Sequence, residues 1–197
     1  KRTCEYDYSQ LNPHMVYFLR DKKMGDEDAY DRVFDGEHRD IVKEAFNAMI
    51  QASTDLIQKP RKLDLSEVDL DWPTLKRAIL DAHKPVADVF FQGHGNHLQF
   101  IDSCIAENVM LNFIRAEDAP VLPVHDSFIM HYAYGELGEL EEEMRRSFHG
   151  YFKKDIRVDN EIGVMLPSSF YGKDSDELTI EQIVHGPPEY SQWESRN

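Results

Sequence analysis

The feature that most constrains this chain is an apolar run over residues 121–130, interrupted at its centre by His125 and Asp126. Apolar residues and a proline lead into this pair, and apolar residues follow it after Ser127. The pattern predicts two short buried strands that meet at or near the pair. A carboxylate held at the end of such a rigid hairpin is well placed to bind a metal ion, provided that another segment supplies a second carboxylate.

The composition limits both the core and the kind of partner. With 197 residues, of which 41% are hydrophobic, the chain is long enough for one domain with a substantial core. Acidic side chains outnumber basic ones 37 to 22, so the net charge of −15 argues against indiscriminate binding of polyanions. Cys4 and Cys104 lack the spacing of metal ligands and favour a reduced, cytoplasmic location. No segment has the roughly 20 consecutive apolar residues of a membrane span, so no membrane partner is expected.

Short strands and helices are expected along the rest of the chain. Residues 39–52 have the clearest helical pattern, because their apolar residues recur every three or four positions. Glu139 and its acidic neighbours up to Glu143 are expected on a solvated helix face. A strand, several helices and then a long helix leading into the hairpin predict an α+β domain, with a small antiparallel sheet packed on helices. The other predicted elements are a strand over residues 4–9, helices from about residue 13 and over 27–34, 72–82, 98–113 and 137–148, a loop over 59–71, and an edge strand over 161–166.

The polar residues of the 39–52 helix also follow a regular pattern. Its residues at every fourth position are two cations and two amides, and residues at this spacing lie along one ridge of a helix. Cations on such a ridge can bind a triphosphate. An ordinary solvated face is the alternative interpretation. The four residues are Arg39, Lys43, Asn47 and Gln51.

Asp7 is the best candidate for the second carboxylate. It falls near the end of the first predicted strand, as Asp126 falls at the hairpin, and apolar residues beside each would fix its position. Two carboxylates placed in this way can bridge two divalent ions about 4 Å apart, which would stabilise both the attacking and the leaving oxygen at a phosphorus centre. Mg²⁺ suits carboxylate and phosphate oxygens.

Three segments, in this order, resemble motifs of the family A nucleic acid polymerases. Residues 7–11, Asp-Tyr-Ser-Gln-Leu, resemble motif A, which carries the first metal-binding aspartate on a palm strand. Arg39 and Lys43 are spaced as on the fingers helix that grips the incoming triphosphate. Residues 124–128, Val-His-Asp-Ser-Phe, resemble motif C in the form of the phage-type single-subunit RNA polymerases, and residues 95–98 are similar to the segment before that motif.

This resemblance implies a polymerase palm with minimal fingers. The palm is expected over residues 1–172, with fingers-like helices at about 20–90 and a polar tail over 173–197. A thumb or other region is expected to precede Lys1. The implied partners are a nucleoside triphosphate and a nucleic acid primer and template in a local cleft, and another protein or the preceding region is a further expected partner.

The resemblance also implies a role for each matching residue. Asp7, the backbone carbonyl of Tyr8 and Asp126 would hold two Mg²⁺ or Mn²⁺ ions. Such ions activate a primer 3′ hydroxyl and stabilise the pyrophosphate. The remaining implied roles are Arg39 and Lys43 on the β and γ phosphates, Asn47 and Gln51 facing the base or sugar, Asn12 where the sugar 2′ position is sensed, and His125 at the primer end or supporting Asp126.

Two departures from the family pattern leave other functions open. Asn12 stands where the DNA enzymes have glutamate and the RNA enzymes glycine, and Asn47 stands where the fingers helix has an aromatic residue or methionine. The choice between DNA and RNA therefore cannot be read from these residues. The alternatives are a degenerate palm that only binds nucleic acid or protein, a two-metal nuclease, and an unrelated α+β protein in which His125 and Asp126 are a buried structural pair.

Overall fold

The structure, a computed structural model, describes residues 3–66, 68–131 and 138–161. The described residues form one antiparallel sheet, in the strand order β2-β3-β1-β4. The predicted hairpin is therefore confirmed, and the first strand of the chain pairs with it. The prediction that both of its strands are buried is wrong for β2, which lies at an edge of the sheet and buries only Val121 of its four residues. The strands are β1 (Thr3–Tyr8), β2 (Val121–Val124), β3 (Ser127–His131) and β4 (Val158–Glu161).

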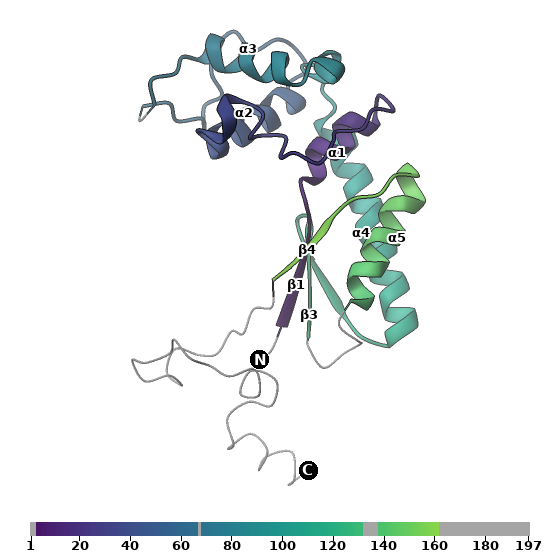
Figure 1. Cartoon of the computed structure of the whole chain (residues 1–197). Helices are drawn as coiled ribbons and strands as arrows, with labels where there is room; N and C mark the ends of the chain where they lie inside the picture. Colours follow the sequence, from purple (N-terminus) through teal and green to yellow (C-terminus); the bar gives the residue numbers. More distant parts are fainter. Residues whose placement is uncertain (1–2, 67, 132–137, 162–197) are drawn as a thin grey trace, which may run out of the picture.

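Helices cover one side of this sheet and also lie beyond one of its ends. They are α1 (Leu11–Phe18), α2 (Arg39–Gln51), α3 (Trp72–Ala82), α4 (Gly95–Glu117) and α5 (Glu139–Phe152), with short 3-10 helices η1 (Phe34–Gly36) and η2 (Lys84–Val89). Figure 1 shows α4 and α5 side by side along the sheet, whereas α2 and α3 lie beyond the end at which β1 leads into α1. This is the predicted α+β fold, with a small sheet packed on helices and a helical insertion.

The two faces of the sheet differ because side chains alternate along each strand. Tyr6 and Tyr8 of β1 are buried together with Phe128 of β3. The Tyr8 hydroxyl donates a hydrogen bond of 2.6 Å to the backbone oxygen of Met144 on α5, and the Tyr8 ring packs edge-on against Phe128. This face therefore fixes β1 against α5, and it leaves Asp7 on the opposite face.

Helix α2 is amphipathic as predicted, with Phe46 at the centre of its buried face. The Phe46 ring packs against Tyr30, His83 and Phe90 at centroid distances of 5.0 to 5.6 Å. His83 is fully buried and its Nδ1 lies 3.0 Å from the Tyr17 hydroxyl. Burial, and next the charge of Arg32, lower the pKa of His83 to about 4, so this imidazole is neutral at pH 7. The insertion is thus joined to α1 by a buried polar contact.

The helix predicted over residues 27–34 is wrong. The structure has turns there, followed by η1. One oxygen of the Asp28 carboxylate accepts hydrogen bonds from the backbone N–H groups of Tyr30 and Asp31, at 2.8 and 3.2 Å. An aspartate that takes up backbone donors in this way favours a turn over a helix. Phe34 and the residue after it then adopt positive φ angles, which end any helical path.

Other predicted boundaries move by a few residues. Helix α4 extends beyond the predicted 98–113 at both ends, and β4 begins before residue 161, where the edge strand was predicted. Strand β4 does lie at an edge of the sheet. The rest of the predicted strand over 162–166, the palm boundary at residue 172 and the predicted tail over 173–197 lie outside the described residues.

The prediction of a fully solvated acidic face on α5 is wrong for Glu143. Only 7% of its side chain is exposed. The carboxylate accepts hydrogen bonds of 2.9 Å from Asn112 of α4 and from the Ser147 hydroxyl, and it pairs with Arg146 at 2.6 Å. A buried carboxylate needs such partners. Glu143 therefore joins α4 to α5 behind the sheet.

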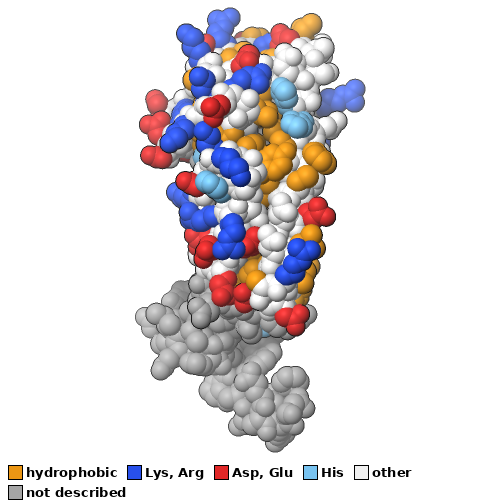
Figure 2. All heavy atoms as spheres, turned by 90° about the vertical axis from the view of Figure 1, so that its right-hand side faces the viewer, with side chains coloured by type: hydrophobic (Ala, Val, Ile, Leu, Met, Phe, Trp, Pro, Cys, Tyr) orange, Lys and Arg blue, Asp and Glu red, His pale blue; other side chains and the backbone are white. Residues whose placement is uncertain are grey.

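The side of the molecule formed by α4 and α5 exposes apolar as well as charged groups. Figure 2 shows hydrophobic side chains in a broken band along this side, between scattered charged residues. Phe100, Leu111 and Ile114 of α4 are among the exposed large hydrophobic residues. Of the helices that the structure describes, none combines the length and the apolar character needed to cross a membrane.

Candidate active site

The candidate site lies where the end of β1 meets the turn of the hairpin. In the β1–β3 register, Asp7 pairs with Ser127, the residue that follows Asp126. The backbone N–H of Tyr8 donates a hydrogen bond of 3.1 Å to the backbone oxygen of Asp126. Two residues 119 positions apart are therefore brought to adjacent strand ends by the backbone ladder alone.

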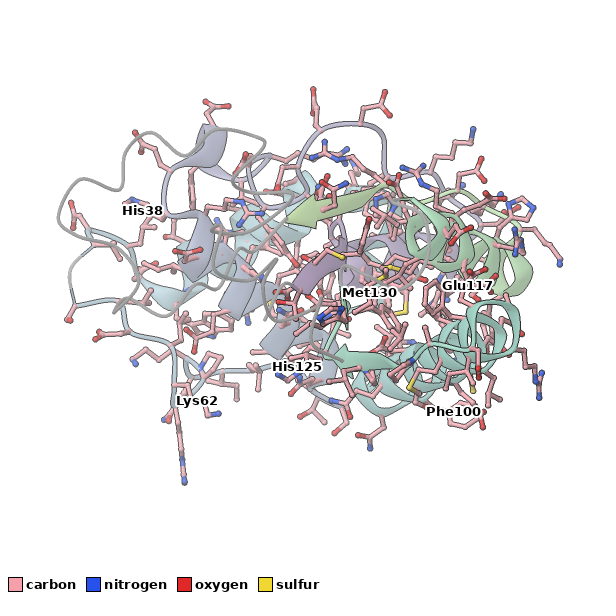
Figure 3. The ribbon with its side chains drawn as sticks, turned by 90° about the horizontal axis from the view of Figure 1, so that it is seen from below. His38, Lys62, Phe100, Glu117, His125 and Met130 are labelled. Carbon is pink, nitrogen blue, oxygen red and sulfur yellow. The ribbon has the colours of Figure 1, made fainter. Side chains whose placement is uncertain are left out.

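The hairpin turn itself consists of His125 and Asp126. Strand β2 ends at Val124 and β3 begins at Ser127, so the connection has two residues. His125 has a φ of 55°, and a positive φ at the first turn position matches the right-handed twist of the flanking strands. The His125 side chain is exposed at the tip, where Figure 3 labels it.

The negative charge of Asp126 acts on the Asp7 carboxylate. Partial burial, and next the negative charge of Asp126, raise the pKa of Asp7 to about 6. A hydrogen bond from Ser127 and the positive charge of Lys43 act in the opposite direction. Three separate segments, β1, the hairpin and α2, thus bring two predicted metal ligands and one predicted phosphate ligand into a common electrostatic environment.

Arg39, the first cation of the α2 ridge, is held within the protein. Its Nη2 lies 2.7 Å from Asp28 Oδ2, and its Nε lies 3.5 Å from Asp31 Oδ1. The guanidinium carbon also lies over the Tyr30 ring, at 5.3 Å from the centroid. Two carboxylates therefore share one guanidinium, and this cluster carries a net charge of −1 when all three groups are ionised.

Lys43, one turn further along α2, differs from Arg39. Its side chain is exposed, and it forms no ion pair with any residue that the structure describes. Its charge nevertheless reaches Asp7. Of these two ridge cations, Lys43 is the one available to an anionic ligand near the carboxylates.

The amide residues of the ridge lie in two different places. Asn12 Nδ2 donates a 3.2 Å hydrogen bond to Asn47 Oδ1, which links α1 to α2. Gln51 instead packs on Gly95, at the beginning of α4. A Cβ added to Gly95 would lie only 2.7 Å from Gln51 Cγ, so the close approach of α2 and α4 requires glycine there. The structure brings Asn12 and Asn47 together and places Gln51 at the far end of the ridge.

Asp102 is a site residue that the sequence analysis missed. It lies on α4, where burial and then the charge of Asp126 raise its pKa to about 6, while His125 opposes the shift. The sequence did contain an indication. Asp102 stands four residues after Leu98 and three before Ile105, both of which are buried. A carboxylate in the apolar stripe of a helix needs a specific reason to be there.

Tyr30 was also missed, because its segment was predicted as a helix. Its buried ring lies between the Arg39 guanidinium and Phe46. Burial is the main reason that the pKa of Tyr30 is raised, and the charge of Asp126 contributes to the rise. Tyr30 thus contacts Arg39 of the α2 ridge, and its phenol group is also affected by the charge of Asp126 in the hairpin.

The donor groups at the site suit a hard divalent cation. Two carboxylates that repel each other are stabilised by a cation between them, and Mg²⁺ accepts few protein oxygens when phosphate and water supply the rest. Among the described residues, no group of three or more histidine, cysteine, aspartate or glutamate side chains could hold a metal ion. Asp159 lies opposite Asp7 on β4, but it is bound to Arg157 at 2.6 Å. Asp7 and Asp126 therefore remain the predicted donor pair.

Comparison with known proteins gives support at the level of the fold. No family model and no curated protein matches the sequence. Among solved structures, the chain is similar to the polymerase domain of Pol1 from M. smegmatis in a complex with DNA primer-template and dNTP, with a TM-score of 0.53 and 15% sequence identity. The chain has a palm-like α+β fold. The match covers 83% of this chain and 39% of the mycobacterial chain, so this chain spans about two fifths of that protein's length.

Proposed function

We propose that this chain is the palm and minimal fingers of a template-directed nucleotidyltransferase, which joins a nucleotide to the 3′ hydroxyl of a primer. The observation that carries the proposal is the strand register that sets Asp7 beside the hairpin turn holding Asp126. The likeness to a polymerase domain supports it at the level of the fold. The proposed extent of the palm is residues 1–172, with the fingers at about 20–90.

Asp7, Asp126 and the Tyr8 carbonyl are the proposed ligands of two Mg²⁺ or Mn²⁺ ions. When bound, such ions favour the ionised 3′ hydroxyl and neutralise charge on the pyrophosphate. The protein's own contribution is to keep both carboxylates fixed on backbone that the sheet holds in place. Because the pKa of Asp7 is about 6, this carboxylate is mostly ionised at pH 7 and above.

The reaction exchanges one phosphorus–oxygen bond for another. The 3′ oxygen of the primer attacks the α-phosphorus of the triphosphate, the bond to the β-phosphate oxygen breaks, and pyrophosphate leaves as the hydroxyl loses its proton. Lys43 binds the β and γ phosphates, since it is the ridge cation without a described ion pair, and its charge acts on Asp7. Arg39 is the second phosphate ligand, and it exchanges part of its contact with Asp28 for phosphate.

The remaining residues position the nucleotide and the primer. The hydrogen-bonded pair of Asn12 and Asn47 faces the sugar, and Gln51 faces the base. His125, exposed at the hairpin tip, contacts the primer end. An amide pair can hydrogen-bond to a sugar hydroxyl in either pentose. The proposal therefore covers DNA and RNA synthesis alike.

A catalytically degenerate palm is the second candidate, because Arg39 is already shared between Asp28 and Asp31. Primer extension separates the candidates. The full-length protein is incubated with a labelled primer on a longer template, with Mg²⁺ or Mn²⁺, and with either dNTPs or NTPs. We expect extension that depends on the template and on the complementary triphosphate. Primer shortening without triphosphates would instead indicate a nuclease, and binding of the duplex without either reaction would indicate the degenerate palm.

A further inference from the structure

The connection between α2 and α3 is unusually long. It runs from residue 52 to residue 71, and all of it except residue 67 is described. Loops longer than roughly 12 to 15 residues are uncommon in compact domains unless they are functional or disordered. This connection includes the loop predicted over residues 59–71.

This loop is held in place at its base by specific contacts. The Trp72 indole N–H donates a 2.8 Å hydrogen bond to the backbone oxygen of Leu56, and Lys76 pairs with Asp55 at 2.7 Å. Leu63 is buried, and its N–H closes a turn on the backbone oxygen of Pro60 at 3.1 Å. The loop is therefore an ordered projection with a defined tip.

The tip carries an apolar residue and a run of cations. Ile57 is 88% exposed, the most exposed of the large hydrophobic side chains that the structure describes. Lys59, Arg61 and Lys62 follow it and are all exposed. Lys59 donates to the backbone oxygen of Leu63, whereas Arg61 and Lys62 form no ion pair with a described residue. Two adjacent cations without a described ion-pair partner thus lie a few residues from a strongly exposed apolar side chain.

This combination of groups fits a single-stranded nucleic acid. Unpaired cations bind phosphates and release counterions, which supplies affinity without sequence preference. Exposed apolar surface gains from contact with the face of a base, and only an unpaired strand offers base faces, because a duplex stacks them inside. An acidic polypeptide would also pair with Arg61 and Lys62, so polyglutamate is included as a competitor in the test below.

The loop lies where such a strand could also approach the candidate site. It begins at Ala52, whose backbone oxygen accepts a 2.8 Å hydrogen bond from the N–H of Gly93, just before α4. Figure 3 shows Lys62 extending outward at the edge of the molecule and His125 nearer the middle of the view. A strand that reaches from the tip to the hairpin turn would cross the surface between them.

We propose that residues 57–62 of this loop are a binding surface for single-stranded nucleic acid, with Arg61 and Lys62 on the phosphates and Ile57 against a base. The identity of that strand as the template ahead of the site rests on the proposed function. The binding itself does not, since it needs neither the metal ligands nor a nucleotide.

Fluorescence anisotropy with a fluorescein-labelled oligothymidylate of 12 residues tests this surface. The full-length protein is titrated in EDTA, without triphosphate, at several salt concentrations. Replacing Arg61 and Lys62 together by glutamine should raise Kd about tenfold and reduce the slope of log K against log salt by about 1.4, because each phosphate contact to a single strand contributes about 0.7. Ile57→Ser should raise Kd about fourfold without changing the slope, as expected for the loss of roughly one buried CH₂ group.

A matched control is the pair Lys22 and Lys23, which is exposed and forms no ion pair with a described residue. Replacing that pair by glutamine removes the same charge from another loop and should leave Kd and slope nearly unchanged. Equal losses in the two double variants would overturn the proposal, because they would reflect net charge alone. Equal binding of a blunt duplex, or competition by polyglutamate as strong as by unlabelled oligothymidylate, would also overturn it.

The same variants distinguish this proposal from the proposed function. If the oligothymidylate binds through the loop and no primer extension occurs, the surface stands and the polymerase assignment fails. If extension occurs and the Arg61 and Lys62 variant binds and extends like the unmodified protein, the assignment stands and the surface fails. Because all five substituted side chains are exposed, circular dichroism and Tm should be unchanged in each variant.

Discussion

The sheet end and the α2 ridge place their functional groups by different means. Asp7 and Asp126 are positioned by backbone pairing between β1 and β3, which is fixed by the buried face of the sheet. Arg39 and Lys43 stand on the exposed face of a helix, and only their side chains can reach the site. Backbone pairing tolerates little displacement, whereas long side chains have alternative partners. We therefore expect that removing either carboxylate abolishes activity. Removing Arg39 or Lys43 should have smaller effects, which differ between the two residues.

The largest expected effect is at the sheet end. Asp126→Asn should lower kcat at least about 1,000-fold, since losing about 4 kcal/mol of charge stabilisation at a metal centre corresponds to that factor. Stability should change little or rise slightly, because the substitution removes a repulsion with Asp7. Single-turnover primer extension and thermal unfolding measure the two quantities.

Asp159→Asn is the matched control for this prediction. Asp159 faces Asp7 across the β1–β4 pair, but its carboxylate is bound to Arg157. The same change of charge one strand away should leave kcat nearly unaltered. Retained activity in Asp126→Asn would refute the assignment of the site, and an equal loss in Asp159→Asn would show that the sheet end requires negative charge in general.

The next largest expected effect is on the KM for the triphosphate, and it should differ between the two cations of the α2 ridge. Lys43→Ala should raise the KM for the triphosphate about 10- to 100-fold, as expected for a lost charge-assisted hydrogen bond of about 1.5 to 3 kcal/mol. Arg39→Ala should raise it less, about two- to fivefold, because Asp28 and Asp31 already share that guanidinium. Steady-state kinetics with varied triphosphate, alongside Tm, measures both.

Asp28→Asn sharpens this difference. Asparagine keeps the oxygen that accepts from Tyr30 and Asp31, so the turn is preserved, but it loses the charge that holds Arg39. The freed guanidinium should lower the KM for the triphosphate. A higher KM in Asp28→Asn would mean that Asp28 positions Arg39 for phosphate binding. An unchanged KM in Lys43→Ala would mean that the ridge is an ordinary solvated helix face.

The smallest expected effect is the dependence of metal binding on pH. The pKa of Asp7 is raised to about 6 in the folded state, above its ordinary value near 4, so the folded protein takes up protons between these values. Without metal, this group alone makes the protein more stable as the pH falls from about 6 to 4. Mg²⁺ needs the ionised carboxylate, so its stabilising effect should be full at pH 7.5 and mostly lost at pH 5.

Thermal unfolding with and without Mg²⁺ at the two pH values measures this effect. At roughly ten times its Kd, Mg²⁺ should raise Tm by about 3 to 6 °C at pH 7.5. Asp7→Asn should remove most of that rise, whereas Asp159→Asn should retain it. The same increase in Tm at pH 5 as at pH 7.5 would show that Asp7 is not a ligand of the ion.

The parts of this fold that could be predicted are those set by local pattern. The hairpin over 121–130 and the helix of α2 follow from strand and helix periodicity within one continuous segment. The helix predicted over 27–34 failed for a local reason as well, because the Asp28 side chain competes for backbone donors. Apolar spacing alone does not reveal that competition.

Partners of individual side chains were much less predictable. Glu143 and Asp102 both lie on helices whose location was predicted, yet the burial of each side chain depends on which helix or hairpin packs opposite. The pairing of Arg39 with Asp28 was missed for the same reason, since the turn that carries Asp28 was predicted as a helix. Contacts of this kind depend on packing between elements that local sequence does not encode.

By itself, the sequence determined the α+β class, the hairpin with His125 and Asp126 at its turn, and the ridge on α2, because each depends on residue periodicity in one segment. Only the tertiary structure decided that Asp7 lies beside that turn, that Lys43 is unpaired among the described residues, and that Arg39 is not. The physical reason is that strand register and ion pairing join residues far apart in the chain. Their energies depend on distance in space, and position along the chain does not fix that distance.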